Sequence, residues 1–435
     1  MKNIRKKKIY HILFWSVISA AFIGPGTVTT ALKAGSLYNT DLLWAIVYSI
    51  IACYVLQEAS SRITIATGFS LSEAIAQKFG NKQIFNVNNL LVIAVIFGCV
   101  AYQAGNMVGA LQGIRLLINI PTGFIILSIY IIAGLILWNG KIHLISRILG
   151  MLVGLMAVIF IILCWQIEFD LKTLVQGLLF PRFPEASSIY ILGLIGTTIV
   201  PYNLFLGSGI SHNQNLEDTR FGLANAIIIG GLITIFILLS GTLITGVFSF
   251  ENIASMFQNK LGRGAGIGFA IGLFSAGLTS SITAPLAAAV TSKSIISSFC
   301  KNDKQLNTYF RNIWIGVLTL GGLFSIIDFQ PVALIVMAQA INGLILPFVA
   351  YYLYIILNDH TTMPEKFINN KLYNFIMLLV IAITIFLGLY HFVQVIFNLI
   401  NFDVPMIWNM MLVGLVSVVL IIKLIIFTIR LDRLD

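Results

Sequence analysis

Charge is scarce in this chain. Only 10% of its 435 residues are Asp, Glu, Lys or Arg, and the acidic residues number 16. In an ordinary soluble domain roughly a quarter of the residues are charged. This composition therefore excludes an ordinary soluble domain. Hydrophobic residues make up 58% of the chain, and apolar runs of about 20 residues, long enough to cross a bilayer, recur from end to end. We therefore predict an all-α, multi-pass integral membrane protein.

Cysteine and histidine are also sparse. Cys53, Cys99, Cys164 and Cys300 are single and widely spaced, which argues against a disulfide framework and against a cysteine-based metal site. The five histidines show no paired spacing, so none is predicted to ligate a metal. No nucleophile with a nearby base and no phosphate-binding glycine loop is evident. The sequence therefore predicts neither an enzyme nor a bound cofactor.

The net charge of +10 reflects membrane topology. If the N-terminus is cytoplasmic, the inside loops, tails and adjoining span ends collect all but six of the 26 Lys and Arg residues. The six exceptions are Lys33, Arg115, Lys172, Arg182, Lys260 and Arg263. We predict both termini to be cytoplasmic, in a bacterial inner membrane. The expected partners are the lipid bilayer and a small ion or small polar solute, and no nucleic acid.

Apolar runs bounded by charge, Pro or Gly predict twelve spans in a single transmembrane domain covering residues 1–435. The first six lie near 11–36, 42–65, 84–112, 121–139, 145–167 and 188–212. The other six lie near 221–248, 265–294, 310–328, 331–356, 372–399 and 404–429.

Two of these spans carry a helix-breaking motif. Gly24-Pro25-Gly26-Thr27 interrupts the first, since proline lacks an N–H and glycine adds backbone entropy. Val200-Pro201-Tyr202-Asn203 interrupts the sixth. Broken backbone at membrane depth is tolerated where it lines a cavity or meets a ligand. Each break is therefore a candidate binding element, although both prolines could instead only kink packing helices.

The two breaks stand five spans apart, and an odd number of spans inverts the second copy relative to the first. This pattern predicts two inverted repeats, at residues 11–167 and 188–356, with paired discontinuous helices. The helices at 372–429 are then accessory. In that architecture the substrate site lies between the two breaks, near the middle of the membrane.

The motifs around the breaks resemble those of the Nramp divalent-metal transporters. The resemblance rests on FIGPGTVTTALKAGSLYNTDLLW at 22–44, IATGFSLSEAI at 65–75, GTTIVPYNLFLGSG at 196–209 and AQAINGLILPF at 338–348. It covers residues 12–356 in matching order. It implies the LeuT-type fold, with ten core helices in two inverted repeats and transport by alternating access.

The resemblance also shows where this chain departs from its family. Nramp proteins carry Asp-Pro-Gly-Asn in the first break, where Gly24 and Thr27 replace Asp and Asn. They carry Met-Pro-His-Asn in the sixth helix, where Val200 and Tyr202 replace Met and His. The predicted substrate-binding residues, which would also hold a metal if a cation binds, are Gly24, Thr27, Thr197, Val200, Tyr202, Asn203 and Gln339.

Such a site offers hydroxyl, amide and carbonyl oxygens without a carboxylate or a thioether. A dehydrated divalent ion should bind it weakly, and the preference for softer metals should be lost. A largely hydrated cation could still bind through water. In the family's proton path the acidic positions of the third helix match Gln103 and Asn106, which do not titrate. Arg311 resembles a family position at the proton exit. Because Gln103 and Asn106 do not titrate, we predict transport uncoupled from protons.

Four further expectations follow from the residues. The glycine-rich first break exposes N–H groups at a helix N-terminus, so an amino acid or organic anion is an alternative cargo. A sensor that keeps the fold without transporting is another. Glu58 and Arg62, four residues apart, are predicted to form an ion pair within their helix. Gln57 and Asn342 are predicted to join helices by hydrogen bonds.

Overall fold

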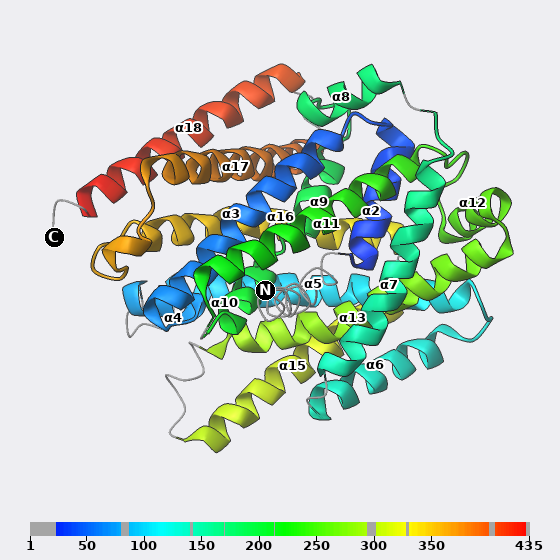
Figure 1. Ribbon diagram of the computed structural model, residues 1–435, viewed down its shortest axis with the longest axis horizontal. Helices are drawn as coiled ribbons and strands as arrows, with labels where there is room; N and C mark the ends of the chain where they lie inside the picture. The colour runs from blue at the N-terminus through cyan, green and yellow to red at the C-terminus, as the bar shows by residue number, and fades with distance from the viewer. Residues whose placement is uncertain are drawn as a thin grey trace, which may run out of the picture.

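The computed structural model describes residues 23–79, 87–139, 142–168, 170–212, 214–293, 302–327, 330–399 and 405–431. These residues form helices and contain no β-strand (Figure 1). The first half contains α2 (Pro25–Tyr38), α3 (Leu43–Thr67), α4 (Leu71–Phe79), α5 (Val87–Arg115), α6 (Thr122–Asn139), α7 (Ile142–Cys164) and α8 (Leu171–Leu179). The second half contains α9 (Ser188–Thr198), α10 (Pro201–Ile210), α11 (Leu216–Gly241), α12 (Phe250–Leu261), α13 (Arg263–Thr291), α15 (Asp303–Ile326), α16 (Pro331–Leu357), a 3-10 turn η1 (Glu365–Phe367), α17 (Lys371–Leu399) and α18 (Met406–Leu431).

Among the described residues, ten helices are long and apolar enough to cross a membrane, with the broken pair α9 and α10 counted as one. The other two predicted spans correspond to α7 and to the first span. Only the second half of that first span, α2, belongs to the described residues. Each of the twelve predicted spans therefore has a helix at its place within the part of the chain that the structure describes, although the ninth begins at Asp303 and not near residue 310.

The seventh span was predicted at 221–248, and this position is wrong by several residues at each end. Helix α11 begins at Leu216, because the Asn215 side chain accepts a hydrogen bond from the Glu217 N–H at the helix start. It ends at Gly241. A separate amphipathic helix, α12, follows and is capped by the Ser249 side chain. Helices α4 and α8 likewise lie in segments that the sequence suggested were connections.

Both predicted breaks are present in the backbone. Helix α2 starts at Pro25, with Gly24 in an extended conformation at its N-cap. Helix α9 ends at Thr198 and α10 starts at Pro201, with extended Val200 before it. In each case the proline is the first helical residue, where its missing N–H leaves no helical hydrogen bond unmade.

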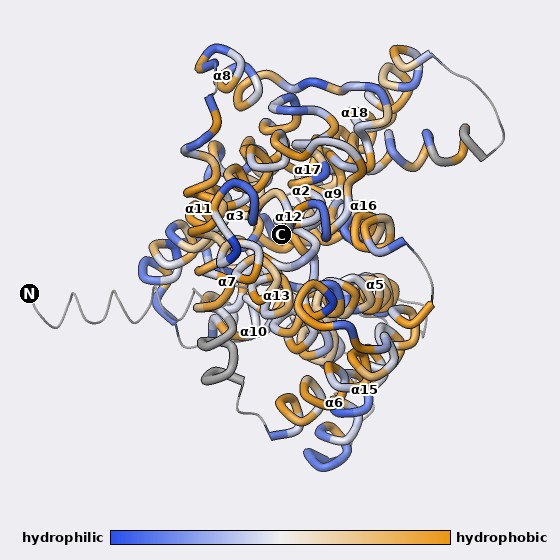
Figure 2. The backbone as a smooth tube through the Cα atoms, turned by 90° about the vertical axis from the view of Figure 1, so that its right-hand side faces the viewer, coloured by the Kyte–Doolittle hydropathy of each residue, from blue (hydrophilic) through white to orange (hydrophobic). Residues whose placement is uncertain are grey.

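The broken helices lie in the interior of the bundle. Helix α2 packs against α5, α9, α11 and α16, and α9 packs against α3 and α16. Figures 1 and 2 place α17 and α18 on one side of this core, and α6 and α15 on the opposite side. Helices therefore surround the two breaks in the interior of the bundle.

The outer helices present apolar side chains outward. Phe124 of α6, Phe375 of α17 and Leu415 of α18 are each about two-thirds exposed. Most helices are coloured as hydrophobic in Figure 2, whereas α8 and several connections carry hydrophilic segments. An apolar exterior of this kind is the surface that lipid tails cover.

Candidate functional site

The two helix breaks meet through a pair of hydroxyl groups. Thr27 Oγ1 in the first turn of α2 lies 2.7 Å from Thr197 Oγ1 near the end of α9, and either can donate the hydrogen bond. The Tyr102 hydroxyl of α5 donates to Thr197 Oγ1 at 3.5 Å. All three side chains are buried. The structure therefore brings Thr27 and Thr197 together, as the sequence predicted, and adds Tyr102.

Tyr202, in the first turn of α10, closes one side of this cluster. Its ring packs edge-on against that of Tyr102, with centroids 5.4 Å apart. Its side chain is 99% buried, yet its hydroxyl has no hydrogen-bond partner among the described residues. A buried hydroxyl without a partner costs free energy. The arrangement suits a ligand or water that would supply the missing bond.

Gln339 of α16 inserts its amide against the first break. A Cβ atom on Gly26 would lie 2.0 Å from Gln339 Nε2, so only glycine permits this approach. Gln339 is 1% exposed, and its Oε1 has no hydrogen-bond partner among the described residues. The sequence placed Gln339 at this site, and the structure sets it directly against the broken backbone.

Asn203 provides further unsatisfied polar atoms beside the second break. Its side chain is 3% exposed, and neither its Oδ1 nor its Nδ2 has a partner among the described residues. Its backbone oxygen accepts a hydrogen bond from Gln57 Nε2 at 3.3 Å. Asn342 Nδ2 similarly reaches the Gly98 carbonyl at 3.5 Å. The prediction that Gln57 and Asn342 join helices is confirmed.

Gly24 and Val200 contribute backbone to the site and no polar side chain. Gly24 lies against Ser280 of α13, whose hydroxyl would be 3.1 Å from a Cβ added at Gly24. Val200 is buried at the N-cap of α10. The neighbouring Thr198 hydroxyl donates to the Leu194 carbonyl of its own helix. Ser280 was missed by the sequence reasoning, because nothing in the apolar pattern of α13 marks its contact with α2.

Gln103 and Asn106 of α5 are almost fully buried, and all four polar atoms of their amides lack partners among the described residues. Gln103 packs against Gly321 of α15, where a Cβ would lie 2.3 Å from its Cγ. Arg311 stands apart from them. It is exposed, and its guanidinium lies 3.9 Å from the centroid of the Trp138 ring. Ten residues separate Arg311 from Gly321, about 15 Å along the helix.

Carboxylates are absent from the breaks and concentrated elsewhere. No group of three or more His, Cys, Asp or Glu side chains that could hold a metal occurs among the described residues. The fully buried Glu58 of α3 instead pairs with Arg62 at 3.3 Å and with Arg220 of α11 at 2.7 Å. The Tyr373 hydroxyl of α17 donates to Glu58 at 2.5 Å. The predicted pair of Glu58 and Arg62 is confirmed, and Arg220 and Tyr373 extend it.

Solved structures of other proteins share this architecture. A manganese transporter of Eremococcus coleocola, solved in complex with an aromatic bis-isothiourea substituted compound, superimposes with a TM-score of 0.73 at 20% identity, covering 99% of this chain and 96% of that one. A nucleobase-cation-symport-1 family transporter with bound bromovinylhydantoin gives 0.60 at 14% identity, covering 97% and 92%. The fold is the LeuT type, with broken first and sixth helices.

The sequence comparisons then define the family. The Nramp family model, described as natural resistance-associated macrophage protein-like, matches residues 16–394. The divalent metal cation transporter MntH of Yersinia pestis is 25% identical over 296 residues, which cover 64% of this chain and 71% of that protein. MntH of Verminephrobacter eiseniae is 25% identical over 290 residues, 62% and 65% of the two chains. The chain belongs to the Nramp family of multi-pass membrane transporters.

Proposed function

We propose that this protein carries a small cation, a divalent metal ion, across the membrane by alternating access at the two helix breaks. The observation that carries the proposal is the set of buried polar atoms beside those breaks that have no hydrogen-bond partner within the described part of the chain. They are the Tyr202 hydroxyl, both amide atoms of Asn203 and Gln339 Oε1. The family membership and the metal transporters among the similar proteins support a cation as the cargo.

The chemistry of these atoms favours a cation that keeps part of its hydration shell. Hydroxyl and amide oxygens are hard ligands without formal charge, so they offset less of the dehydration cost than a carboxylate does. The Asn203 Nδ2 cannot ligate a cation, but Asn203 Oδ1 and Gln339 Oε1 can accept hydrogen bonds from a coordinated water. Without a Met sulfur, the site should also discriminate little between manganese and the harder Mg²⁺ and Ca²⁺.

Transport is proposed to be uncoupled from protons. Gln103 and Asn106 occupy the positions of the family's acidic residues, and amides do not titrate in the physiological range. Arg311 lies outside this buried pair, stacked on Trp138. A pH gradient across a liposome membrane should therefore leave the uptake rate unchanged.

The test is Mn²⁺ uptake into proteoliposomes, measured by quenching of a trapped metal-sensitive dye, with Mg²⁺ and Ca²⁺ as competitors. Gly24→Asp is the informative variant, because Gly24 already has the extended N-cap conformation that Asp favours. Its matched control is Gly24→Asn, which has nearly the same shape and no charge. We expect slow uptake by the wild type with broad competition, and faster uptake only in Gly24→Asp. Absence of uptake in all three proteins contradicts the proposal.

A second cargo class rests on a different observation. Helices α2 and α10 begin at buried positions, and neither N-terminus receives a side-chain cap. Helix N-termini attract anionic groups, so an amino acid or organic anion is the alternative. Thermal stabilisation of the purified protein by such a compound, without any metal effect, would favour it. Lack of response to every solute would favour the non-transporting sensor.

A further inference from the structure

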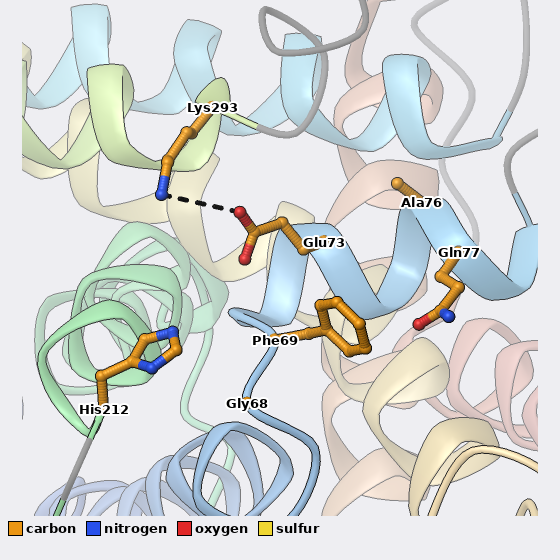
Figure 3. Close-up of a pocket in the computed structure, with 7 residues that line it drawn as sticks. All are labelled: Gly68, Phe69, Glu73, Ala76, Gln77, His212 and Lys293. Atoms are coloured by element: carbon orange, nitrogen blue, oxygen red, sulfur yellow. Dashed lines mark ion pairs between the residues drawn. The ribbon is translucent and has the colours of Figure 1, made fainter. Parts of the chain in front are cut away.

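A hollow of about 610 Å³ lies near the end of α10 that is farther from the break. We call it the α4 pocket. Its lining comes from the link between α3 and α4, from α4 itself, and from residues after α10 and α13 (Figure 3). The lining residues are Gly68, Phe69, Glu73, Ala76, Gln77, His212 and Lys293. It belongs to the end of the molecule that the charge distribution predicts to be cytoplasmic.

Glu73 uses its two carboxylate oxygens for different purposes. Oε2 accepts hydrogen bonds from the backbone N–H and the hydroxyl of Ser70, which forms a capping box at the start of α4. Oε1 faces Lys293 of the α13 end at 3.6 Å (Figure 3). Burial alone raises the pKa of the Glu73 carboxyl, but the bonds from Ser70 and the charge of Lys293 hold it below its usual value. The capping box therefore presents an ionised oxygen to Lys293.

Ser208 of α10 connects this region to the second break. Its hydroxyl accepts a hydrogen bond from the Leu71 N–H at the start of α4, at 2.6 Å. It also lies 2.6 Å from the Thr64 hydroxyl of α3. Ser208 follows Asn203 by five residues, about 7.5 Å along the same helix. A shift of α10 at the break would therefore be transmitted directly to the first turn of α4.

The two ends of α4 are held with unequal firmness. At the far end, Lys78 pairs with Asp359 at 2.6 Å, and the Asp359 side chain is 1% exposed. Hydroxyls of Thr361 and Thr362 also donate to Asp359. At the near end, Glu73 and Lys293 are 26% and 52% exposed and farther apart. An exposed ion pair is weaker than a buried, hydrogen-bonded one, so the contact of α4 with the α13 end should release before its contact with Asp359. The bond from the Leu71 N–H to Ser208 keeps the first turn of α4 attached to α10.

We propose that Glu73 and Lys293 form a latch that holds α4 against the end of α13 beside the α4 pocket and opens when α10 moves. The pair at Lys78 and Asp359 is then the fixed end about which α4 swings. The inference builds on the proposed function, because an opened pocket gives cargo released beside Asn203 a route toward the predicted cytoplasmic side. Glu73 and Lys293 control this access without binding the cargo.

The latch is tested by the reactivity of a cysteine placed in the pocket, Ala76→Cys. Cys53, Cys99 and Cys164 are buried, and Cys300, which lies outside the described residues, is replaced by Ser in every variant. Glu73→Gln removes the charge and keeps the capping box, because Gln serves equally well at this position. Lys293→Met removes the other partner. The readout is the rate at which a small thiol reagent labels the purified protein.

Each variant should raise the labelling rate by about two- to fivefold, the factor that a weak exposed ion pair contributes. The double variant Glu73→Gln with Lys293→Met should rise no further than the larger single effect, because both changes remove one interaction. Arg182→Met is the matched control. It breaks an exposed pair with Asp41, at 2.6 Å, that does not line the pocket, and it should leave the rate unchanged.

Unchanged labelling in both single variants overturns the latch, and so does a double variant whose effects multiply. The experiment requires no cargo, so its outcome is separable from that of the uptake assay. Uptake without a labelling response would support the proposed function and contradict the latch. A labelling response without uptake would support the latch and contradict the proposed cargo.

Discussion

Two buried polar regions of this protein are built in opposite ways. Around Glu58, each carboxylate oxygen meets a cationic partner, and Tyr373 adds a hydrogen bond. Among the described residues, the side chains that meet at the helix breaks carry no formal charge, and Tyr202, Asn203 and Gln339 keep polar atoms without partners. Buried groups that serve structure satisfy one another, whereas groups that serve a ligand leave bonds for it. The proposed function uses the polar atoms that lie beside the breaks and have no partner in the described part of the chain.

The largest effect should come from breaking the satisfied region. Glu58→Gln leaves Arg62, which is 4% exposed, without its charge partner. Removing one member of a buried ion pair typically costs about 3–5 kcal/mol. We expect the free energy of unfolding in detergent to fall by that amount. Arg182→Gln at the exposed pair with Asp41 is the control and should cost less than about 1 kcal/mol. Equal losses of unfolding free energy in the two variants would contradict the distinction between the buried pair and the exposed pair.

Crowding the unsatisfied region should have the next largest effect. In Gly26→Ala the new methyl group would overlap the Gln339 amide, which has little space to move. Overpacking of this kind costs about 1–3 kcal/mol, and cargo binding should be lost as Gln339 is displaced. Adding Gln339→Ala should restore stability and leave binding impaired. Gly123→Ala, which meets nothing within 4 Å, is the control, and thermal unfolding with and without Mn²⁺ measures both properties.

Making a second group of buried amides, on α5, apolar should raise stability. Gln103 and Asn106 together bury four amide atoms without partners among the described residues. Replacing both with Leu removes that desolvation cost, and the free energy of unfolding should rise by about 1–2 kcal/mol. Lower stability of the double variant would mean that water already satisfies these amides. Denaturation experiments on the double variant and on Gln103→Glu, which adds a carboxyl at the same place, decide whether these amides lack partners or bind water.

The smallest effect concerns Asp359, which lies outside the spans. Burial raises the pKa of its carboxyl, but Lys78 and the hydroxyls of Thr361 and Thr362 outweigh burial and lower the pKa overall. A folded-state pKa below that of the unfolded chain adds stability at neutral pH, which is lost as pH falls below about 4. Asp359→Asn should therefore be less stable than wild type at pH 7 and equally stable in acid. A constant difference across that range contradicts this origin.

The sequence predicted the helical architecture and both breaks because their signals are local. Apolar runs of span length and the two prolines, Pro25 and Pro201, are visible within short windows. The connecting helices α4, α8 and α12 were missed, since they are too short to show a long apolar run. The start of the seventh span was placed too late because charge was taken to bound each span, whereas Glu217 and Asp218 lie in the first turn of α11, where acidic residues stabilise a helix.

The site was predictable only as a list of residues. Family motifs placed Thr27, Thr197 and Gln339, but the contacts among them depend on how α2, α9 and α16 pack. Tyr102 and Ser280 join the cluster from helices that carry no break, so no sequence signal marks them. Arg220 and Tyr373 contact Glu58 although they are distant from it in the sequence, so no local sequence signal marks them either.

The hydroxyl pair of Thr27 and Thr197 also gives the site a reversible polarity. Either oxygen can donate the bond, so rotating two hydroxyl hydrogens reverses the local dipole while every heavy atom stays in place. One orientation makes Thr27 the donor within the pair and the other makes it the acceptor. The two breaks are therefore joined by a bond whose direction can change without any movement of α2 against α9.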